Sequence, residues 1–355
     1  MEFLLQPGVY TTGTSRSLLN MLDRMWLKEH LLGEGCLYII SGFANYNGGV
    51  RFYPAFLEHT RKGGRIIAVL GGSASQRLSS LQVVEALLDC GVELHVVNRK
   101  RLVHAKCYGV LDERGEELIV TSGNFTGPGM SQNVEAAIRV NQENISDIGF
   151  SWEELLNNIF DQGWDVYKLE QTDISSKLNP GWSLLYDEVR DTVKLDDSQL
   201  VSMVVLLSHS DTARIQADAG TNAEKGTQYF WLSKASFDFF PALTEKNKRG
   251  IKNTYSCDIN LNYIDLGMTQ RAKVTFEADN NLDFRLGTGA YRRTKVAEER
   301  DLAIITRRSE YDYEIRIIGK TEPVYSQMLS YATQYIGNFG KRFGYIDNET
   351  LFSII

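Results

Sequence analysis

Polar side chains able to handle a phosphate occur at alternate positions in two neighbouring segments of the chain. His104 and Lys106 stand two residues apart, and Ser122 and Asn124 stand two residues apart one segment later. Residues two apart on a strand share a face, so each pair is expected to point one way. Lysine and asparagine can bind phosphoryl oxygens, while histidine attacks phosphorus or moves protons. Glu135 begins a later strand and could hold an imidazole N–H.

Chance alone rarely produces this set. With 5 His and 16 Lys in 355 residues, roughly 0.2 His-x-Lys pairs are expected at random. The pair is weak evidence by itself, but the Ser-x-Asn pair and the later acid strengthen it. The alternation also predicts that Ala105 and Cys107 point into the core. No cluster of Asp, Glu, His or Cys stands nearby to hold a metal, so no metal is expected at this site.

The elements that must position these residues alternate between strand and helix. Buried strands are predicted at 37–43, 65–70, 92–97, 103–111, 117–122 and 134–140, and helices at 53–61, 80–89 and 151–168. Such alternation indicates an α/β layered domain over residues 1–170.

The second half of the chain has a different character. Residues 171–195 are polar around Pro180-Gly181, which predicts an inter-domain linker, although its apolar residues indicate that part of it packs on a domain. Residues 196–355 carry short apolar strands at 200–207, 274–278, 302–306 and 313–318. Long polar segments separate these strands, so we expect a mainly β barrel or sandwich with two long arms.

Composition limits the class of protein. Hydrophobic residues make up 43% and charged residues 23%, which is typical of a globular chain. No apolar stretch is long enough to span a membrane, and the first residues lack a secretory pattern. The four cysteines are scattered, without the paired spacing of a disulfide framework or a zinc site. We therefore expect a cytoplasmic protein without membrane contact. The net charge is −7, yet 285–308 holds seven basic and three acidic residues, a local balance of +4. Nucleic acid binding would therefore depend on local contacts.

The motif residues resemble the single HKD motif of the phospholipase D superfamily. The usual aspartate five residues after the lysine is replaced by Leu111, with Asp112 beside it. This departure, with Glu135 as the acid, is more similar to the endonuclease branch than to the lipases. A nuclease domain followed by a β domain with two basic arms resembles the BfiI-like restriction endonucleases. The resemblance implies a phospholipase-D-like α/β sandwich, with a mixed sheet and flanking helices, followed by a mainly β B3-like pseudobarrel that grips DNA with its arms.

The resemblance also implies a mechanism. The superfamily builds one site from two HKD motifs, and His104 alone among the five histidines has a lysine two places on. A homodimer through the nuclease domain is therefore implied, with one His104 as nucleophile forming a phosphohistidine and the other as general acid, then base. Lys106 and Asn124 would hold phosphoryl oxygens, Glu135 would set the tautomer of His104, and Ser122 would support the phosphate or the histidine. No cofactor is implied for cleavage.

The two arms would contact double-stranded DNA. The first spans about 208–231 and the second about 279–295. Basic, amide and hydroxyl side chains of these segments can donate to phosphates or base edges: Arg214, Gln216, Thr221, Asn222, Lys225, Asn280, Asn281, Arg285, Tyr291, Arg292, Arg293 and Lys295. For each residue alone, surface solvation explains the side chain equally well.

Three functions are consistent with the sequence. The first is a sequence-specific, type II-like restriction endonuclease. The second is a phospholipase-D-type phosphodiesterase acting on other substrates, against which the basic arms argue. The third is a DNA-binding module without catalysis, against which the intact motif argues. Some relatives cut only with a separate ATP-dependent helicase or translocase subunit; the chain has no Walker motif, so ATP would enter only through such a partner.

Overall fold

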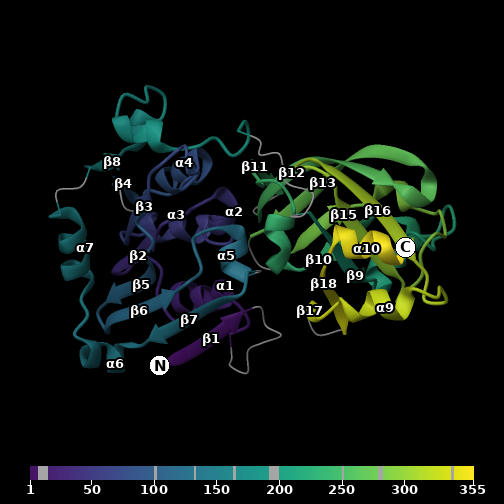
Figure 1. The fold of residues 1–355 in the computed structure, drawn as a ribbon, viewed down its shortest axis with the longest axis horizontal. Helices are drawn as coiled ribbons and strands as arrows, with labels where there is room; N and C mark the ends of the chain where they lie inside the picture. Colours follow the sequence, from purple (N-terminus) through teal and green to yellow (C-terminus); the bar gives the residue numbers. More distant parts are fainter. Residues whose placement is uncertain are drawn as a thin grey trace. The chain divides into compact units, whose positions relative to one another are not determined.

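The structure is a computed structural model that forms two compact units, Met1–Asp191 and Thr192–Ile355. The described residues are 1–6, 15–99, 102–131, 133–162, 165–191, 200–249, 252–278, 283–336 and 340–355. Figure 1 shows the first unit in purple to teal and the second in teal to yellow.

The first unit is organised around a mixed sheet. Its described strands are β1 (Glu2–Gln6), β2 (Cys36–Ser41), β3 (Arg65–Gly71), β4 (Glu93–Asn98), β5 (Lys106–Asp112), β6 (Gly115–Thr121), β7 (Glu135–Val140) and β8 (Asp165–Leu169). They lie in the order β1-β7-β6-β5-β2-β3-β4-β8. β2, β3 and β4 are parallel, as expected when helices connect them, and the remaining neighbours are antiparallel. The predicted α/β architecture with a mixed sheet is therefore confirmed.

Helices cover both faces of this sheet. They are α1 (Leu18–Asp23), η1 (Arg24–Lys28), α2 (Tyr46–Gly49), α3 (Tyr53–Arg61), α4 (Leu81–Asp89), α5 (Gly127–Ser131), α6 (Gln142–Ile145), η2 (Ser146–Ile148), α7 (Trp152–Phe160), η3 (Gln171–Asp173) and η4 (Pro180–Leu184). Figure 1 shows α7 on one face and α1, α2, α3 and α5 on the other. On the α7 face, the ring of Trp152 stacks on Tyr38 with centroids 4.4 Å apart. On the other face Trp26 meets Phe52 and Phe56 edge-on. These buried aromatic contacts fix the helices on the sheet.

The single helix predicted over 151–168 is wrong in its second half. α7 ends at Phe160, and residues 165–169 instead form β8, which pairs antiparallel with β4. The segment has valine and tyrosine beside a free strand edge, and ladder hydrogen bonds along that edge outweigh its helical spacing.

The second unit is mainly β. Its described strands are β9 (Val201–Leu206), β10 (Tyr229–Leu232), β11 (Glu245–Arg249), β12 (Lys252–Tyr263), β13 (Met268–Glu277), β14 (Phe284–Gly287), β15 (Leu302–Arg307), β16 (Asp312–Ile318), β17 (Gln334–Ile336) and β18 (Lys341–Asp347). They follow the order β10-β14-β13-β12-β16-β15-β9-β18-β17, with β11 paired to β12. The sheet curls into a nearly closed, barrel-like body, which confirms the mainly β prediction.

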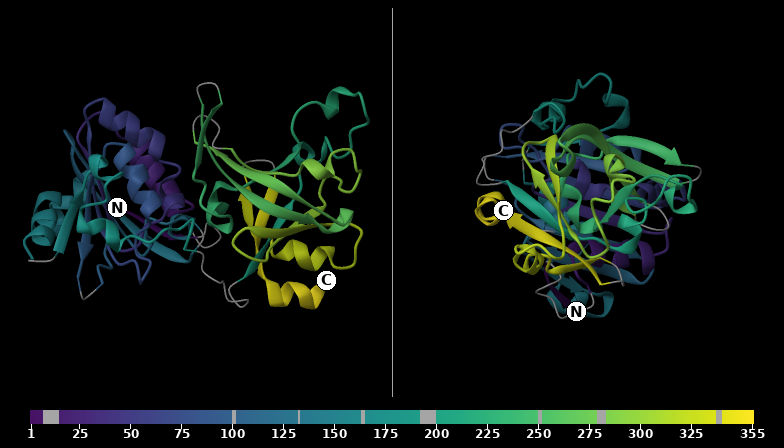
Figure 2. Two further views of the ribbon diagram at one scale, coloured as in Figure 1. Left: turned by 90° about the horizontal axis from the view of Figure 1, so that it is seen from above. Right: turned by 90° about the vertical axis from the view of Figure 1, so that its right-hand side faces the viewer.

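Short helices complete this unit: η6 (Asn222–Glu224), α8 (His209–Thr212), η7 (Lys234–Phe239), η8 (Ile264–Leu266), η9 (Gly289–Tyr291), α9 (Tyr325–Ser330) and α10 (Asn348–Ile354). α9 and α10 lie side by side against the sheet (Figure 2). Met328 and Leu351 from these helices pack with Val204, Ile304 and Ile346 in one core cluster. The long strand β12 was not predicted, although Tyr255, Cys257, Ile259 and Leu261 alternate with polar residues, which is the pattern expected of a half-buried strand.

The two predicted arms are not free loops. The 208–231 segment contains α8, η6 and most of β10, and the 279–295 segment contains β14 and η9. β10 pairs antiparallel with β14, from Tyr229 opposite Gly287 to Leu232 opposite Phe284. Each arm therefore contains one of two paired strands at one end of the sheet.

The segment predicted as a linker lies at the division between the units. Residues 171–191 belong to the first unit, where Tyr186 forms a bridge with Ser80 and Glu188 accepts a hydrogen bond from Ser80 Oγ. Residues 192–199 lie outside the described residues. The assignment of functional domains to these ranges stays a prediction.

Candidate functional site

His104 lies just before a strand rather than on it. β5 begins at Lys106, so the alternation expected for a strand does not apply to His104 and Ala105. Both of these residues are exposed, while Lys106 is buried. The expectations that His104 and Lys106 point the same way along one strand, and that Ala105 faces the core, are therefore corrected. Cys107 is half-buried and packs on the core cluster under α7.

The His104 imidazole is presented to solvent beside an aromatic ring. The ring of Phe43, which follows β2, meets it edge-on with centroids 6.4 Å apart. Gly42 comes so close to the segment before β5 that a Cβ there would lie 2.2 Å from the carbonyl oxygen of Val103. Only glycine allows this approach, which holds the histidine at the end of the neighbouring strand β2.

Lys106 contacts the backbone of His104. Its Nζ donates a hydrogen bond of 2.8 Å to the backbone carbonyl of His104. Burial lowers the pKa of Lys106, and the negative charge of Glu135 acts in the opposite direction. A partly desolvated ammonium binds an incoming anion more strongly than one in water, because less solvent screens the charge.

Asn124 joins the same group of residues from the loop after β6. Its Oδ1 accepts a hydrogen bond of 3.2 Å from the backbone N–H of Phe43, so its Nδ2 amide remains a donor for a phosphoryl oxygen. A Cβ at Gly129 would lie 2.5 Å from the carbonyl oxygen of Asn124. The loop therefore packs closely on the segment around Gly129, and Asn124 joins it to the backbone of Phe43, whose ring meets His104.

Ser122 and Glu135 form a pair at the rim of the site. Ser122 Oγ donates a hydrogen bond to one carboxylate oxygen of Glu135, and Asn133 Nδ2 donates to the other at 3.1 Å. Ser122 Oγ also accepts from the backbone N–H of Ala136 at 3.0 Å. The contacts of Glu135 in the described part of the chain therefore run to Ser122, Asn133 and the charge of Lys106, whereas the predicted bond to His104 is not among them.

Asp112, which stands next to the position of the motif's usual aspartate, serves another purpose. Its carboxylate lies 3.1 Å from Nδ1 of the buried His30 and also pairs with Arg114. Asp112 is therefore part of the packing at the far end of β5.

The sequence patterns missed residues that come from the end of β2. Gly42 and Phe43 shape the surroundings of His104, and Ser41 Oγ accepts a hydrogen bond of 2.9 Å from the backbone N–H of Phe125. The run Ser-Gly-Phe after a buried strand was the available signal, because glycine at a strand end often marks a close backbone approach.

In the second unit, basic residues of one arm pair with acidic residues of the other. Arg293 Nη1 lies 3.3 Å from Glu224, and Arg292 donates to the Glu224 backbone carbonyl at 2.5 Å. Lys295 Nζ contacts Asp218 at 2.8 Å and lowers the pKa of that carboxyl. The two arms therefore lie side by side, and part of the positive charge is neutralised within the unit.

The remaining predicted DNA contacts differ in exposure. Arg214 and Gln216 are half-buried and donate to the backbone carbonyls of Lys225 and Ala297. Thr221, Asn222 and Lys225 are exposed. Tyr291 is fully buried and its hydroxyl donates to Asp265 at 2.6 Å, so it belongs to the core, which corrects the prediction for this residue. Asn280 and Asn281 lie outside the described residues.

The sequence patterns missed Tyr229, an aromatic residue that two arginines of the arms approach. The guanidinium groups of Arg285 and Arg214 lie 5.2 Å and 5.8 Å from the centroid of the Tyr229 ring. Trp231 meets the same ring edge-on at 5.1 Å. Arginines held over aromatic rings keep a fixed orientation, which suits contact with bases or phosphates.

The backbone of the second arm is unusual. Arg293 and Lys295 have φ values of 61° and 60°, a left-handed conformation that residues with a side chain adopt rarely. Arg300, just beyond the arm, has a φ of 73°. Such conformations cost free energy and cluster at functional surfaces.

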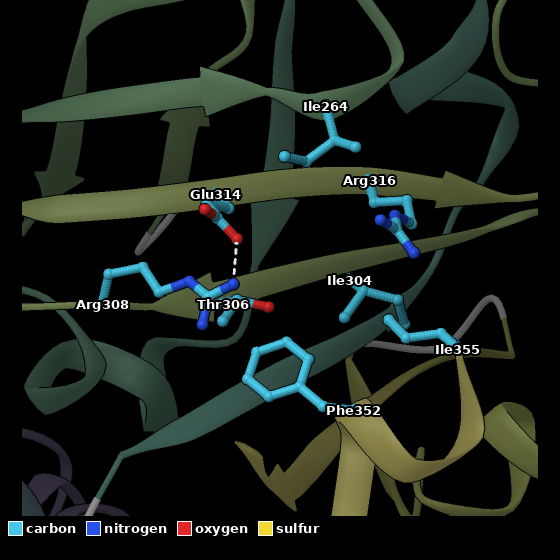
Figure 3. A pocket seen from close by; sticks show the side chains of 8 residues that line it. All are labelled: Ile264, Ile304, Thr306, Arg308, Glu314, Arg316, Phe352 and Ile355. Carbon is cyan, nitrogen blue, oxygen red and sulfur yellow. Dashed lines mark hydrogen bonds and ion pairs between the residues drawn. The ribbon is translucent and has the colours of Figure 1, made fainter. Parts of the chain in front are cut away.

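A pocket of about 160 Å³ in the second unit contains none of the predicted site residues. Figure 3 shows Arg308 paired with Glu314 on one side and Arg316 among Ile304, Ile264 and Ile355 on the other. Among the described residues, no group of three or more His, Cys, Asp or Glu could hold a metal ion. Within the same residues, no helix has the length and apolar character needed to cross a membrane.

Comparison with known proteins identifies the second unit. Residues 195–355 match a family model described as "Metal-independent restriction enzyme BfiI DNA binding domain". The resemblance to BfiI-like restriction enzymes is thereby confirmed for this part of the chain. No curated protein matches the chain.

Three solved structures show distant likeness. Polyphosphate kinase from Porphyromonas gingivalis is 10% identical with a TM-score of 0.32, and the match covers 48% of this chain and 24% of the kinase. The phospholipase D family member Nuc from Salmonella typhimurium is 14% identical, with a TM-score of 0.29 and coverages of 43% and 89%. NucT from Helicobacter pylori is 10% identical, with a TM-score of 0.30 and coverages of 44% and 94%. All three TM-scores are below 0.5, a level that does not by itself establish a shared fold.

Proposed function

We propose that this chain, whose residues 195–355 belong to the BfiI DNA-binding domain family, is a metal-independent DNA endonuclease with a phospholipase-D-type site. The observation that carries the proposal is the group formed by His104, Lys106 and Asn124 around the ends of β2 and β5. An exposed imidazole, a buried ammonium and an amide together can bind a phosphodiester and attack its phosphorus.

The chemistry follows from these positions. The ammonium of Lys106 and the amide of Asn124 bind the non-bridging oxygens and offset the charge that develops on them. The His104 imidazole attacks phosphorus, the bond to the leaving oxygen breaks, and a phosphohistidine forms. A second imidazole donates a proton to the leaving oxygen and then takes one from the water that hydrolyses the phosphohistidine. Ser122 and Glu135 border this site and act on its charge through Lys106.

One chain supplies one such imidazole, so the complete site requires two copies. An apolar row on the first unit supports a homodimer. Phe3 on β1 stands opposite Ile138 on β7, and Ile138 stands opposite Val120 on β6. These side chains are 60%, 45% and 48% exposed.

The position of this row supports the same conclusion. Two residues further along their strands, Leu118 and Val140 are buried under α7, so one face of the sheet is covered at one end and bare at the other. The bare end continues to Ser122, two residues beyond Val120, at the rim of the site. A two-fold contact between such patches would bury apolar surface and bring two sites together.

The second unit supplies recognition of double-stranded DNA. Its arms carry the Arg214–Tyr229–Arg285 group and the exposed basic residues of 292–295. We assign sequence specificity to this unit, in a B3-like arrangement, and restriction as the biological role. Any requirement for ATP would come from a separate helicase or translocase subunit, because the proposed cleavage residues need no nucleotide.

Cleavage of plasmid DNA by the His104→Ala variant tests the proposal. With EDTA present, the wild type is expected to cut, and the variant is expected to lose at least about a thousandfold in rate, because no other group replaces the nucleophile. Binding of the variant to the same DNA should be unchanged. Glu153→Ala, a change at an exposed residue of α7 in the first unit, is the control and should still cut.

Three results would contradict the proposal in different ways. Cutting by His104→Ala at the wild-type rate would exclude this histidine. A requirement for a divalent metal in the wild type would exclude the metal-independent mechanism. Binding without any cutting, with and without a helicase partner, would favour a DNA-binding module.

A further inference from the structure

A buried ion pair joins the two ends of the first arm. Asp211 on α8 is fully buried, and Lys341 on β18 is 5% exposed in its side chain. Lys341 Nζ donates to both carboxylate oxygens of Asp211, at 2.8 Å and 2.7 Å. A third hydrogen bond of 2.6 Å runs from Nζ to the backbone carbonyl of Trp231.

The remaining lone pairs of the Asp211 carboxylate hold the arm itself. One oxygen accepts the backbone N–H of Trp231 at 2.8 Å, at the end of the 208–231 segment. The other accepts the backbone N–H of Ser208 at 2.7 Å and its Oγ at 2.5 Å, at the start of that segment. One carboxylate therefore closes the base of the first arm.

The same pair crosses the seam of the barrel, the place where the two ends of its sheet approach each other. β10, which contains Trp231, is the strand at one end of the sheet order, and β18 lies next to the strand at the other end. Strand pairing does not join β10 to β18 in the described sheet, whereas Lys341 and Asp211 do so with side chains.

The second arm depends on the first. Gln228 Nε2 donates to the backbone carbonyl of Asp211 at 2.8 Å and to Thr288 Oγ1 at 3.2 Å. The backbone N–H groups of Arg293 and Lys295 donate to the carbonyls of Arg214 and Ile215 at 3.0 Å and 3.1 Å. A shift of the first arm at its base would therefore move the second.

We infer that Asp211 and Lys341 are positioning residues for DNA recognition: their buried pair at the barrel seam sets where both arms meet the duplex. The inference rests on the proposed DNA recognition by the second unit. Neither side chain touches DNA in this role, since both are buried. Base readout needs donors placed within a fraction of an ångström, whereas phosphate contacts tolerate more movement. Loss of the pair should therefore reduce discrimination between sequences more than overall affinity.

The experiment uses the full chain in the His104→Ala background, so that DNA is not cut. A random-sequence duplex library is selected on the chain with Asp211 and Lys341 intact, and each variant is then measured on the enriched and the unselected pools. The ratio of the two affinities is the specificity ratio. Asp211→Asn, Lys341→Met and the double variant are compared with Arg271→Met/Asp258→Asn, an ion pair between β13 and β12 in the same unit that lies outside both arms and outside residues 285–308.

The double variant separates positioning from stability. Each single change leaves one buried group without its charge partner and lowers the melting temperature, whereas removing both charges together restores much of it. Asparagine at position 211 has one side-chain oxygen, so it can accept from Trp231 or from Ser208 but not from both. The base of the first arm therefore stays loosened in the double variant. We expect the specificity ratio of the double variant to stay about tenfold or more below that of the parent, with affinity for the unselected pool within about twofold.

The outcomes are distinct. If the double variant regains the specificity ratio together with its melting temperature, or if the control pair lowers the ratio equally, the pair has a structural role alone and the inference fails. If the parent chain enriches no sequence at all, the proposed recognition function fails instead.

Discussion

At the scale of single residues, the site depends on a backbone approach that no larger residue allows. Gly42 faces the carbonyl of Val103, and a Cβ would also lie 3.3 Å from the Cα of His104. This contact crosses from the end of β2 to the segment that carries the imidazole, so any added atom must displace that segment.

Gly42→Ala should therefore lower the cleavage rate by roughly tenfold to a hundredfold, because displacement of a reacting group by about 1 Å has effects of this size. Binding of DNA should remain within experimental error of the wild type. Gly319→Ala is the matched control, because a Cβ there would meet a flexible glutamate side chain at 3.5 Å. A rate for Gly42→Ala equal to that of the control would show that the segment adjusts freely.

A second feature at this scale is a carboxyl group with a raised pKa. Glu188 accepts hydrogen bonds from Ser80 Oγ at 2.8 Å and from the Tyr46 backbone N–H at 2.9 Å. Desolvation nevertheless raises the pKa of Glu188 from 4.5 to about 7. Between these values the folded chain binds more protons at this group than the unfolded chain does. Its contribution to stability is therefore full below pH 4.5 and is lost as the pH rises through 7.

Glu188→Gln should remove this dependence, because the amide resembles the protonated acid. We expect its melting temperature to match that of the wild type near pH 4.5 and to exceed it at about pH 8. Asp187→Asn is the control: desolvation of Asp187 is outweighed by hydrogen bonds, chiefly from Gln82, that lower its pKa, so its effect should not vary between about pH 5 and 8. Parallel melting curves for Glu188→Gln and the wild type across this range would contradict the assignment.

At the scale of elements, the bare end of one sheet face is the contact surface of the homodimer that we propose. β1 joins β7 at the edge of the sheet and adds Phe3 to the row that Ile138 and Val120 begin. Two consecutive strands, β6 and β7, and the distant β1 thus place exposed apolar side chains beside the rim formed by Ser122. Monomeric proteins rarely leave such a row uncovered.

Ile138→Lys should convert the protein from dimer to monomer, because a charge would be buried at the centre of the contact. Sedimentation of the full chain should show the change in mass, and cleavage should fall at least about a hundredfold since each monomer holds one imidazole. Leu31→Lys, which alters a leucine that is 64% exposed elsewhere on the first unit, should change neither property. A wild type that sediments as a fully active monomer would rule out the dimer.

At the scale of the whole molecule, the two units divide the proposed work. Met1–Asp191 holds the group around His104, and Thr192–Ile355 holds the arms and contains the range that matches the DNA-binding family. Each has its own hydrophobic core. The net charge of −7 excludes attraction of DNA by a general field, so affinity must come from local contacts on the arms.

Fragments corresponding to the two units should separate the functions. In gel-shift competition, the 192–355 fragment should prefer the duplex enriched by the full chain over scrambled duplexes. Replacing a basic residue that binds a phosphate should weaken binding to all duplexes alike and lower the salt dependence of the affinity by about one unit of slope. The 1–191 fragment should show no preference. A preference in the first fragment would reverse the assignment of the units.

The class of each half could be predicted from the chain alone, because alternating strands and helices indicate an α/β layer and short apolar strands indicate a mainly β domain. Spacing of two between His104 and Lys106 and between Ser122 and Asn124, followed by an acid, indicated a phosphate site, which stays a prediction. The expected shared face does not apply to His104, because this residue precedes β5 instead of lying on it. The basic residues of 285–308 indicated the recognition surface, which also stays a prediction.

Features that depend on residues far apart in the chain required the three-dimensional fold. Lys106 is buried and His104 exposed because the strand starts between them, a boundary set by pairing with β2. Residues 165–169 form a strand because the edge of β4 is open to them. Asp211 and Lys341 meet across 130 residues because the sheet curls until its ends approach. Periodicity along the chain reports which residues share a face, whereas pairing and curvature, which depend on the whole sheet, select which faces meet.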